Sequence, residues 1–304
     1  MYKISSFFCI LENIRPKGNT FYVMKLKSLL IPLLLITNSI TAQQITCSAK
    51  DKEIFTQKIA LLKKGYTPTA DFGKIVVYVG KTFLGTPYVA KTLEIGTKES
   101  LVINLQGLDC TTFVENVLAF GLLLKNNKED FEAYTKYLEK IRYKDGILNG
   151  YTSRLHYFSE WISNNQQKGI IKNNTADIGG VEIEKEINFM STHRDLYPFL
   201  KEGKNFEGIL QSEKAVSKSP FCFLPKEEVK ENEGSIAPGD IIALTTSIKG
   251  LDITHTGIAT REKDGRIHLL HASTKGQVEI SDLPLAEYLQ KIKNNTGIMV
   301  SRPQ

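Results

Sequence analysis

The sequence predicts an α+β fold, because helical periodicity dominates its first half and strand-like segments return near its end. Between residues 55 and 167, apolar residues recur at the spacing that places them on one face of a helix. From residue 240 onward, short apolar segments are separated by turn residues, including the hairpin signal Asp264-Gly265. Helices followed by an antiparallel sheet are typical of α+β proteins.

A secretory signal peptide is predicted within the first 42 residues, which we exclude from the fold. Met24-Lys25-Leu26-Lys27 is a short basic start, residues 29–36 form an apolar run, and Thr41-Ala42 offers a cleavage point. This run is too short to span a bilayer. We therefore expect a start at Met24, cleavage near Ala42, and a periplasmic or secreted mature chain without a stable membrane span. A longer leader, or a buried core helix here, remains an open alternative.

The charge of the chain gives no sign of a nucleic-acid partner. Five of the 39 basic residues and one of the 33 acidic residues fall in the leader, so the net charge of +6 drops to about +2 on its removal. Residues 43–304 suit one large domain, or a core with a subdomain.

Five helices are expected before the strands begin. Asp71 precedes the second as a helix start, and Gly65 and Gly169 are stop signals after the first and the last. The helical patterns cover residues 55–62, 75–83, 111–124, 131–141 and 155–167.

Strands are expected in the last third of the chain, at residues 240–244, 254–260 and 266–272. Residues 170–233 are polar and indicate a loop-rich segment, with a short alternating piece at 181–187.

Cys110 is the first candidate for chemistry, because it stands where a loop becomes a helix. Unpaired N–H groups and the helix dipole at that position lower the pKa of a thiol, and the same N–H groups can stabilise an oxyanion. The alternative is a buried structural cysteine. Cys9 leaves with the leader, so an odd number of thiols remains in an exported chain, and whether Cys47 pairs with Cys222 stays open.

Two histidines downstream complete a candidate triad. His255, Gly257 and Ala259 share one strand face, and the two small residues leave room for the helix of the cysteine. The hairpin sets the next strand alongside, so that His271 can reach His255. A thiol nucleophile, an imidazole base and a third orienting group form the logic of cysteine hydrolases.

A catalytic metal is the rival use for these histidines. Zinc hydrolases need three converging ligands, whereas His268 and His271 point to opposite faces of the sheet by parity, and no His-Glu-x-x-His element occurs. We therefore expect neither a metal nor a cofactor.

Together these residues resemble the NlpC-type papain-like cysteine hydrolases, which act on peptidoglycan. The resemblance implies that Cys110 is the nucleophile, His255 the general base, His271 the orienting residue, and Tyr88 a residue that lines the site. It rests on Gly85-Thr86-Pro87-Tyr88, Asp109-Cys110, Pro238-Gly239-Asp240, His255-Thr256-Gly257 and His271-Ala272-Ser273.

A closer resemblance is to the N-acetylmuramoyl-L-alanine amidase-like branch of that superfamily. It implies hydrolysis of the amide between the lactyl group of N-acetylmuramic acid and L-alanine, in peptidoglycan or its fragments. The implied fold is a papain-like core of about 71–125 and 235–300, with an inserted, helical subdomain of about 126–234. The motifs are Thr86-Pro87-Tyr88-Val89-Ala90 with Leu93-Glu94, Asp109-Cys110-Thr111-Thr112-Phe113-Val114-Glu115-Asn116, and Ser153-Arg154-Leu155-His156-Tyr157-Phe158.

Two other functions stay in competition: an NlpC-type endopeptidase that cleaves within the stem peptide, and a non-catalytic wall-binding module. The endopeptidase is weakened because this chain lacks the Gly-Gly after the tyrosine and the Ser-Gly after the Asp-Cys pair that are common in those enzymes.

A set of residues around the triad is predicted to bind substrate. Arg154 can bind a carboxylate in bidentate fashion, with His156 near the sugar or the cleavage site, although both also suit a solvated helix start. Asp109 can bind an amide or amine, or merely orient the cysteine loop, and Glu94 and Glu115 suit surface or capping positions. The predicted substrate-binding residues are Tyr88, Glu94, Asp109, Thr111, Arg154 and His156.

Overall fold

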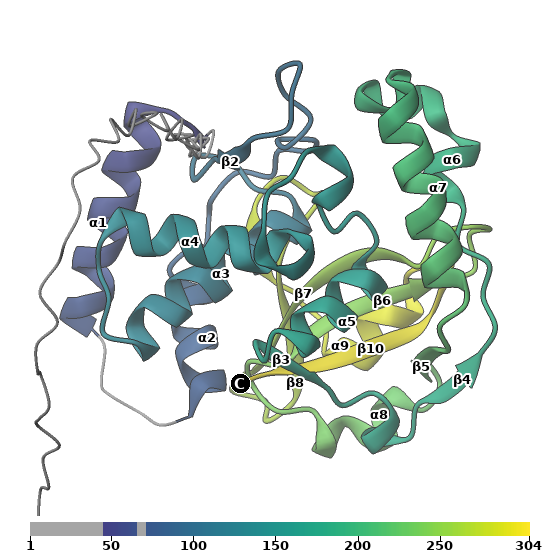
Figure 1. Cartoon of the computed structure of the whole chain (residues 1–304). Helices are drawn as coiled ribbons and strands as arrows, with labels where there is room; N and C mark the ends of the chain where they lie inside the picture. Colours follow the sequence, from purple (N-terminus) through teal and green to yellow (C-terminus); the bar gives the residue numbers. More distant parts are fainter. Residues whose placement is uncertain (1–44, 66–70) are drawn as a thin grey trace, which may run out of the picture. The chain divides into compact units, whose positions relative to one another are not determined.

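The computed structural model describes residues 45–65 and 71–304, in which helices pack on both faces of a large antiparallel sheet (Figure 1). This arrangement confirms the predicted α+β class. The predicted leader, with its start at Met24 and its cleavage point near Ala42, lies outside the described residues. Among those residues, no helix is long and apolar enough to cross a membrane.

The main sheet is antiparallel in every strand pair of the described residues, with the order β4-β5-β10-β6-β7-β8-β9 and with β3 paired to one part of β10. The three strands predicted near the end of the chain are β6, β7 and β8, and the turn at Asp264-Gly265 joins the last two as expected. The strands are β3 Ile171–Asn173, β4 Val181–Ile183, β5 Phe221–Pro225, β6 Ile241–Thr246, β7 Ile253–Arg261, β8 Ile267–Ala272, β9 Val278–Ile280 and β10 Asn295–Pro303.

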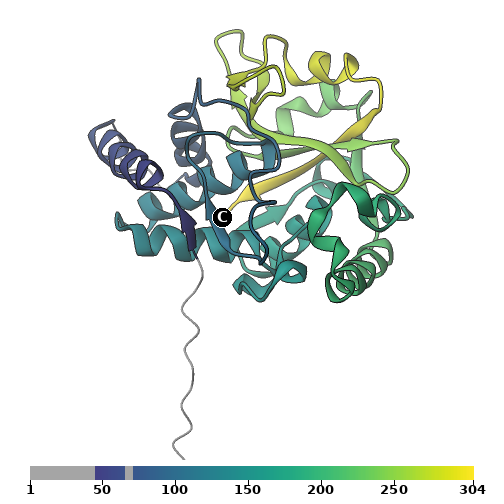
Figure 2. The same ribbon diagram turned by 90° about the horizontal axis from the view of Figure 1, so that it is seen from above.

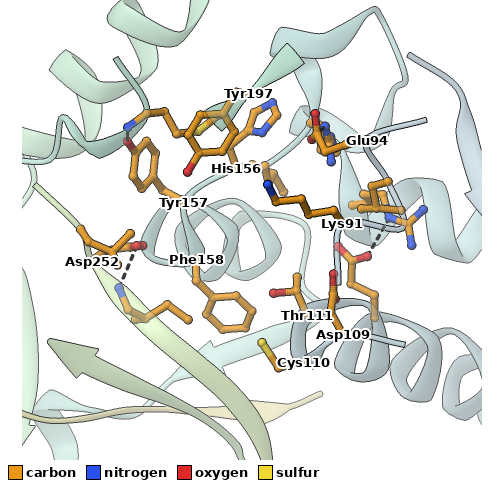
Figure 3. A pocket seen from close by; sticks show the side chains of 18 of the residues that line it. Lys91, Glu94, Asp109, Cys110, Thr111, His156, Tyr157, Phe158, Tyr197 and Asp252 are labelled. Carbon is orange, nitrogen blue, oxygen red and sulfur yellow. Dashed lines mark hydrogen bonds and ion pairs between the residues drawn. The ribbon is translucent and has the colours of Figure 1, made fainter. Parts of the chain in front are cut away.

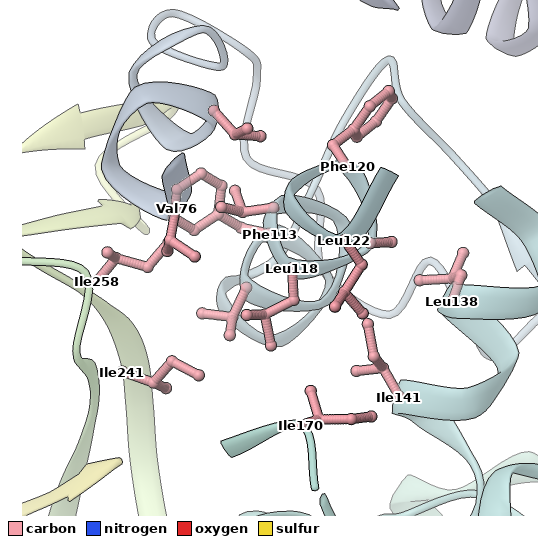
Figure 4. Packing of buried hydrophobic residues seen from close by; sticks show 14 of the residues in the cluster. Val76, Phe113, Leu118, Phe120, Leu122, Leu138, Ile141, Ile170, Ile241 and Ile258 are labelled. Carbon is pink, nitrogen blue, oxygen red and sulfur yellow. The ribbon is translucent and has the colours of Figure 1, made fainter. Parts of the chain in front are cut away.

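Four helices form a layer on one face of this sheet: α2 Phe72–Lys81 and α3 Cys110–Lys125 contact the sheet, and α1 Ala49–Gly65 and α4 Phe131–Arg142 pack against α3. All four were predicted. α3 lies at the centre of the layer, where Figure 4 shows its apolar side chains between α2, α4 and the sheet. A helix that is apolar nearly all round is typical of such an enclosed position.

The opposite face of the sheet is covered by α8 Val229–Asn232 and α9 Leu285–Gln290. Neighbouring strand residues alternate between the two faces, so Ile258 of β7 packs in the α3 cluster and Ala259 packs in the α9 cluster.

The middle segment departs from the loop-rich prediction, because it contains the helix α7 Gly203–Ser217 and the short α6 Phe189–Thr192 (Figure 2). The buried residues of α7 are Ile209, Ser212 and Glu213. A helix that buries polar side chains gives little hydrophobic periodicity, which explains why the sequence pattern missed it.

The predicted subdomain of 126–234 is interleaved with the rest of the fold. β3 and β5 pair with β10, and α4 packs against α3. A separate apolar cluster around Tyr151, Leu200 and Ile209 supports the outer part of this segment. Its boundaries remain a prediction.

The helix predicted at 155–167 starts three residues late, as α5 Phe158–Gln167. Arg154 forms an isolated antiparallel bridge with Tyr143, and the amide of Leu155 donates to the carbonyl of Arg142 at 3.0 Å. These extended contacts delay the start of the helix.

At the beginning of the described chain, β1 Ile45–Cys47 pairs in parallel with β2 Leu101–Ile103.

Candidate active site

A cleft of about 300 Å³ opens at the start of α3 (Figure 3). Its walls include the loop of Lys91 to Glu94, the α3 start, the segment of Arg154 to Phe158, and the chain of Leu251 to Thr254 that leads into β7. Six of the nine site residues predicted from the sequence line it: Glu94, Asp109, Cys110, Thr111, Arg154 and His156.

Cys110 is the first residue of α3, as predicted, and Asp109 is the N-cap. The Asp109 carboxylate accepts hydrogen bonds from the N–H of Thr112 and from its hydroxyl, both at 2.8 Å, and the Thr112 hydroxyl accepts from the N–H of Asp109 at 2.9 Å. This reciprocal capping box fixes the turn that presents the thiol. Asp109 therefore orients the cysteine loop, one of the two roles considered for it.

The half-buried Cys110 thiol is not a low-pKa thiol in this structure. Burial raises its pKa to about 11 and the nearby Asp109 carboxylate adds to the rise, while hydrogen bonds from the N–H of Thr256 and from Thr111 act in the opposite direction. The expectation that the helix start lowers the pKa is outweighed by desolvation. The resting site therefore holds a neutral thiol.

His255 and His271 lie side by side on β7 and β8, with the Nε2 atom of His255 2.6 Å from the Nδ1 atom of His271. The predicted approach of the two rings is thus present. Burial lowers the pKa of His255 to about 4 and that of His271 to about 3, so both rings are neutral at pH 7.

The sulfur of Cys110 accepts a hydrogen bond from the amide of Thr256, the residue after His255, which brings the thiol to the same part of β7. In the described residues no hydrogen bond joins Cys110 directly to His255. Catalytic hydrogen bonds often form only when substrate is bound.

The space beside Gly257 is not filled by the helix of the cysteine, contrary to the sequence-based expectation. A Cβ atom there would lie 2.8 Å from the carbonyl oxygen of Leu270 and 2.9 Å from the Cβ of His271. The glycine therefore permits the close approach of β8, and hence of His271. α3 packs on the other face, against Ile258.

Tyr88 lies near Cys110 and Asp109 but is not among the residues that line the cleft, so its role as a site-lining residue stays a prediction. Burial raises the pKa of its hydroxyl, and the nearby Cys110 and Asp109 raise it further. Tyr288, from α9, has its pKa raised by burial and in part by Cys110, and its ring packs edge-on against His271. No pattern in the sequence indicated Tyr288 as a site residue.

Arg154 is buried and already bound by two carboxylates. Its Nη2 donates to Glu94 and its Nε lies 3.2 Å from an oxygen of Glu99. The alternative of a solvated helix start is therefore wrong, and so is the surface position considered for Glu94. Burial raises the pKa of Glu99, and the Arg154 charge opposes that rise.

His156 lies in the cleft wall opposite α3, with its ring tilted at 44° to that of Tyr151, and its Nε2 atom is 2.8 Å from the Tyr151 carbonyl oxygen (Figure 3). Burial holds its pKa well below the usual value, and the positive charge of Arg154 lowers it further. The ring is therefore neutral, and its Nε2–H donates to the carbonyl.

Comparison with known proteins decides the family. The model of the AmiA-like, N-acetylmuramoyl-L-alanine amidase-like family matches residues 78–298, which include the whole cleft. The chain belongs to this family.

Solved structures agree with the assignment to the AmiA-like family. A structure named N-acetylmuramoyl-L-alanine amidase from Bacteroides uniformis is 39% identical, covers 77% of this chain and 99% of its own, and has a TM-score of 0.73. A Bacteroides fragilis protein provisionally named a xylanase is 42% identical, covers 73% of this chain and 98% of its own, and has a TM-score of 0.70. No curated protein matches.

A more distant structure shares the fold alone. It comes from Legionella pneumophila, is 21% identical, covers 84% of this chain and 94% of its own, and has a TM-score of 0.61.

Four further charged residues of the AmiA-like cleft were not predicted as site residues. Lys91 and Asp252 line it, and so do Arg142 and Glu115, which are bound to each other. Asp252 accepts hydrogen bonds from the N–H and the hydroxyl of Ser159, which ties β7 to α5. In the sequence, the one indication that Asp252 belongs to the site was its position three residues before His255.

The part of the chain that the structure describes contains no group of three His, Cys, Asp or Glu side chains placed to hold a metal ion. The ring of His268 is instead hydrogen-bonded, through Nε2 to the Asp264 carboxylate and through Nδ1 to the Ser281 carbonyl. Cys47 and Cys222 are free thiols in the structure, and Cys222 is buried.

Proposed function

We propose that this protein is an exported cysteine amidase of the NlpC-type papain-like superfamily, which hydrolyses the amide between N-acetylmuramic acid and L-alanine in peptidoglycan or its fragments. The observation that carries the proposal is the position of Cys110. In a chain of the amidase-like family, this thiol stands at a helix start inside the cleft, next to the strand that holds the His255–His271 pair.

The mechanism begins from a neutral thiol and a neutral imidazole, because burial raises the pKa of Cys110 and lowers that of His255, and both shifts disfavour the ion pair. His255 accepts the proton of Cys110 as the sulfur attacks the carbonyl carbon of the lactyl amide. The new S–C bond forms as the C=O electron pair moves to oxygen. When the C–N bond breaks, His255 returns the proton to the L-alanine nitrogen.

A thioester of the lactyl group remains on Cys110 after the peptide leaves. His255 takes a proton from water as the water oxygen adds to the thioester carbon. The tetrahedral adduct then collapses, the C–S bond breaks, and the proton on His255 passes to the Cys110 sulfur; the lactyl acid leaves and loses its remaining proton to solvent. No cofactor takes part in either half.

The oxyanion that forms when the sulfur attacks the carbonyl carbon requires backbone N–H donors that are not already bound to the Asp109 cap of α3. In the first turn of α3, the N–H of Thr112 donates to the Asp109 carboxylate and that of Phe113 donates to the Asp109 carbonyl at 2.9 Å. We therefore assign the oxyanion to the amides of Cys110 and Thr111.

The provisional xylanase name of one relative is not supported by this cleft. Glycosidases use two carboxylates, one as acid and one as nucleophile or base. Here Glu94 is bound by Arg154, Glu115 by Arg142, Asp109 by the helix cap, and Asp252 by the N–H and hydroxyl of Ser159. None of them is placed as a free acid–base pair.

Mass spectrometry of the products tests the function. The protein from residue 43 is incubated with a disaccharide-peptide wall fragment and with the free stem peptide. Release of an intact peptide that begins with L-alanine, with the free peptide untouched, establishes the amidase. Cleavage inside the stem of both compounds supports the endopeptidase instead, and binding without any product supports a wall-binding module.

Export is proposed from the first 42 residues and has its own test. Expression of the full chain with its native leader should yield a periplasmic or secreted protein whose measured mass corresponds to cleavage near Ala42. An uncleaved chain retained in the cytoplasm contradicts it.

A further inference from the structure

Lys91 is the basic residue of the cleft whose charge is left without a partner. The guanidinium groups of Arg142 and Arg154 are bound by Glu115 and by Glu94 with Glu99. Within the described residues, the exposed Lys91 side chain forms no hydrogen bond or ion pair. The ammonium is therefore available to an anion that enters from solution.

The backbone of Lys91 directs this side chain over the cleft. Its φ of 60° lies in the left-handed region, which residues other than glycine rarely adopt. In Figure 3 the side chain of Lys91 extends across the cavity above Thr111 and Asp109, toward the side that carries His156 and Tyr157. Backbone conformations of this kind are often kept at ligand sites.

Lys91 also borders a second hollow, lined by Thr92, Val102 and Gln106. Its ammonium reaches over the cleft to one side of Cys110, so a substrate group next to the reacting amide, rather than the amide itself, would meet it (Figure 3).

The chemistry of the substrate class decides which group this is. The lactyl carboxyl of the muramoyl sugar is consumed in the scissile amide, so that the sugar side has no free carboxylate. The γ-linked glutamate after L-alanine, in contrast, keeps its α-carboxyl free. A compact lysine ammonium is suited to such a carboxylate.

Resting on the proposed function, we propose that Lys91 binds the free α-carboxylate of the second stem residue, and thereby places the leaving peptide along the loop of Lys91 to Glu94. The sugar then lies on the opposite side of Cys110. Lys91 acts in substrate selection and does not take part in proton transfer.

The test compares two synthetic substrates that differ in one group. One is N-acetylmuramoyl-L-alanyl-γ-D-glutamyl-L-lysine amide with the α-carboxyl of glutamate free, and the other carries a carboxamide there. Wild-type protein should prefer the acid in kcat/KM by about 10-fold or more, the factor that one charge-assisted hydrogen bond supplies. In Lys91→Met this ratio should fall to about one.

Two variants serve as matched controls. Lys98→Met removes the same charge from another exposed position of the same loop, outside both hollows, and should keep the wild-type ratio. Lys91→Arg keeps the charge and should retain most of the preference. Thermal midpoints of all variants are compared with that of the wild type, because only a folded variant reports on recognition.

An equal ratio in the wild type and Lys91→Met, with both compounds cleaved at the lactyl amide, overturns this inference and leaves the amidase intact. Cleavage of neither compound by the wild type overturns the proposed function, and this inference with it.

Discussion

The Nε2 atom of His255 lies 2.6 Å from the Nδ1 atom of His271, and this relationship determines which tautomers can support catalysis. His255 can accept the Cys110 proton only if its other nitrogen, Nδ1, carries a free lone pair. Its Nε2 must then carry the hydrogen and donate it to His271. The neutral His271 consequently holds its own hydrogen on Nε2, an atom that is buried without a hydrogen-bond partner in the described structure.

The ranking of the two histidines follows from this arrangement. His255→Ala removes the proposed base and should lower kcat by about 10³-fold or more, whereas His271→Ala removes only the proposed orienting acceptor and should cost about 10- to 100-fold. His271→Asn, which can still accept a hydrogen bond, should recover part of the loss. Turnover of a muropeptide at pH 7 measures the three variants, and the reverse ranking means that the two roles are exchanged.

Replacement of the nucleophile separates chemistry from binding. Cys110→Ala should abolish turnover and keep the fold, because the half-buried thiol contributes little packing area. Isothermal calorimetry with the uncleaved muropeptide should still detect binding. Cys47→Ala, the control at another half-buried thiol, should remain active. Full activity of Cys110→Ala would sink the mechanism.

The pH dependence distinguishes a neutral resting pair from an ion pair. Burial lowers the pKa of His255 to about 4, so the unprotonated base is fully present at neutral pH and is lost only as the pH falls through this value. The thiol, with a pKa of about 11, stays protonated over the same range. We expect kcat/KM to be nearly flat from about pH 5 to 8.

The measurement is kcat/KM against pH, with circular dichroism at each pH to confirm that the protein is folded. A fall in kcat/KM as the pH drops through about 6.5, the ordinary pKa of imidazole, would contradict a His255 pKa that burial has lowered.

The buried ion pair of Glu115 and Arg142 should be essential for stability. Both side chains are 2% exposed, the Nε of Arg142 lies 2.7 Å from a Glu115 oxygen, and its Nη1 donates to the carbonyl of Val102. Glu115→Ala leaves an uncompensated buried guanidinium and should reduce the free energy of unfolding by about 3–5 kcal/mol.

Urea denaturation measures this loss. The control is Glu53→Ala, which breaks the exposed pair with Lys50 on α1 and should change the free energy of unfolding by less than about 1 kcal/mol. Similar values for the two variants would show that burial does not govern the cost.

Much of the fold was predictable because its determinants are local. The apolar spacing of α1 to α4, the Asp71 and Asp109 caps and the Asp264-Gly265 turn act within a few residues of one another. α7 escaped prediction because its burial of Ser212 and Glu213 depends on partners elsewhere in the chain, such as Tyr157, whose hydroxyl donates to Glu213 at 2.7 Å.

The sequence by itself determined the helix start that presents Cys110 and the hairpin that brings His271 to His255, since both follow from short-range backbone rules. Only the tertiary structure decided that the thiol rests neutral, that Arg154 is bound by Glu94 and Glu99, and that Lys91 has no partner among the described residues. The physical reason is that pKa values and ion pairs depend on burial and on neighbours brought together by folding, which the spacing of residues along the chain does not contain.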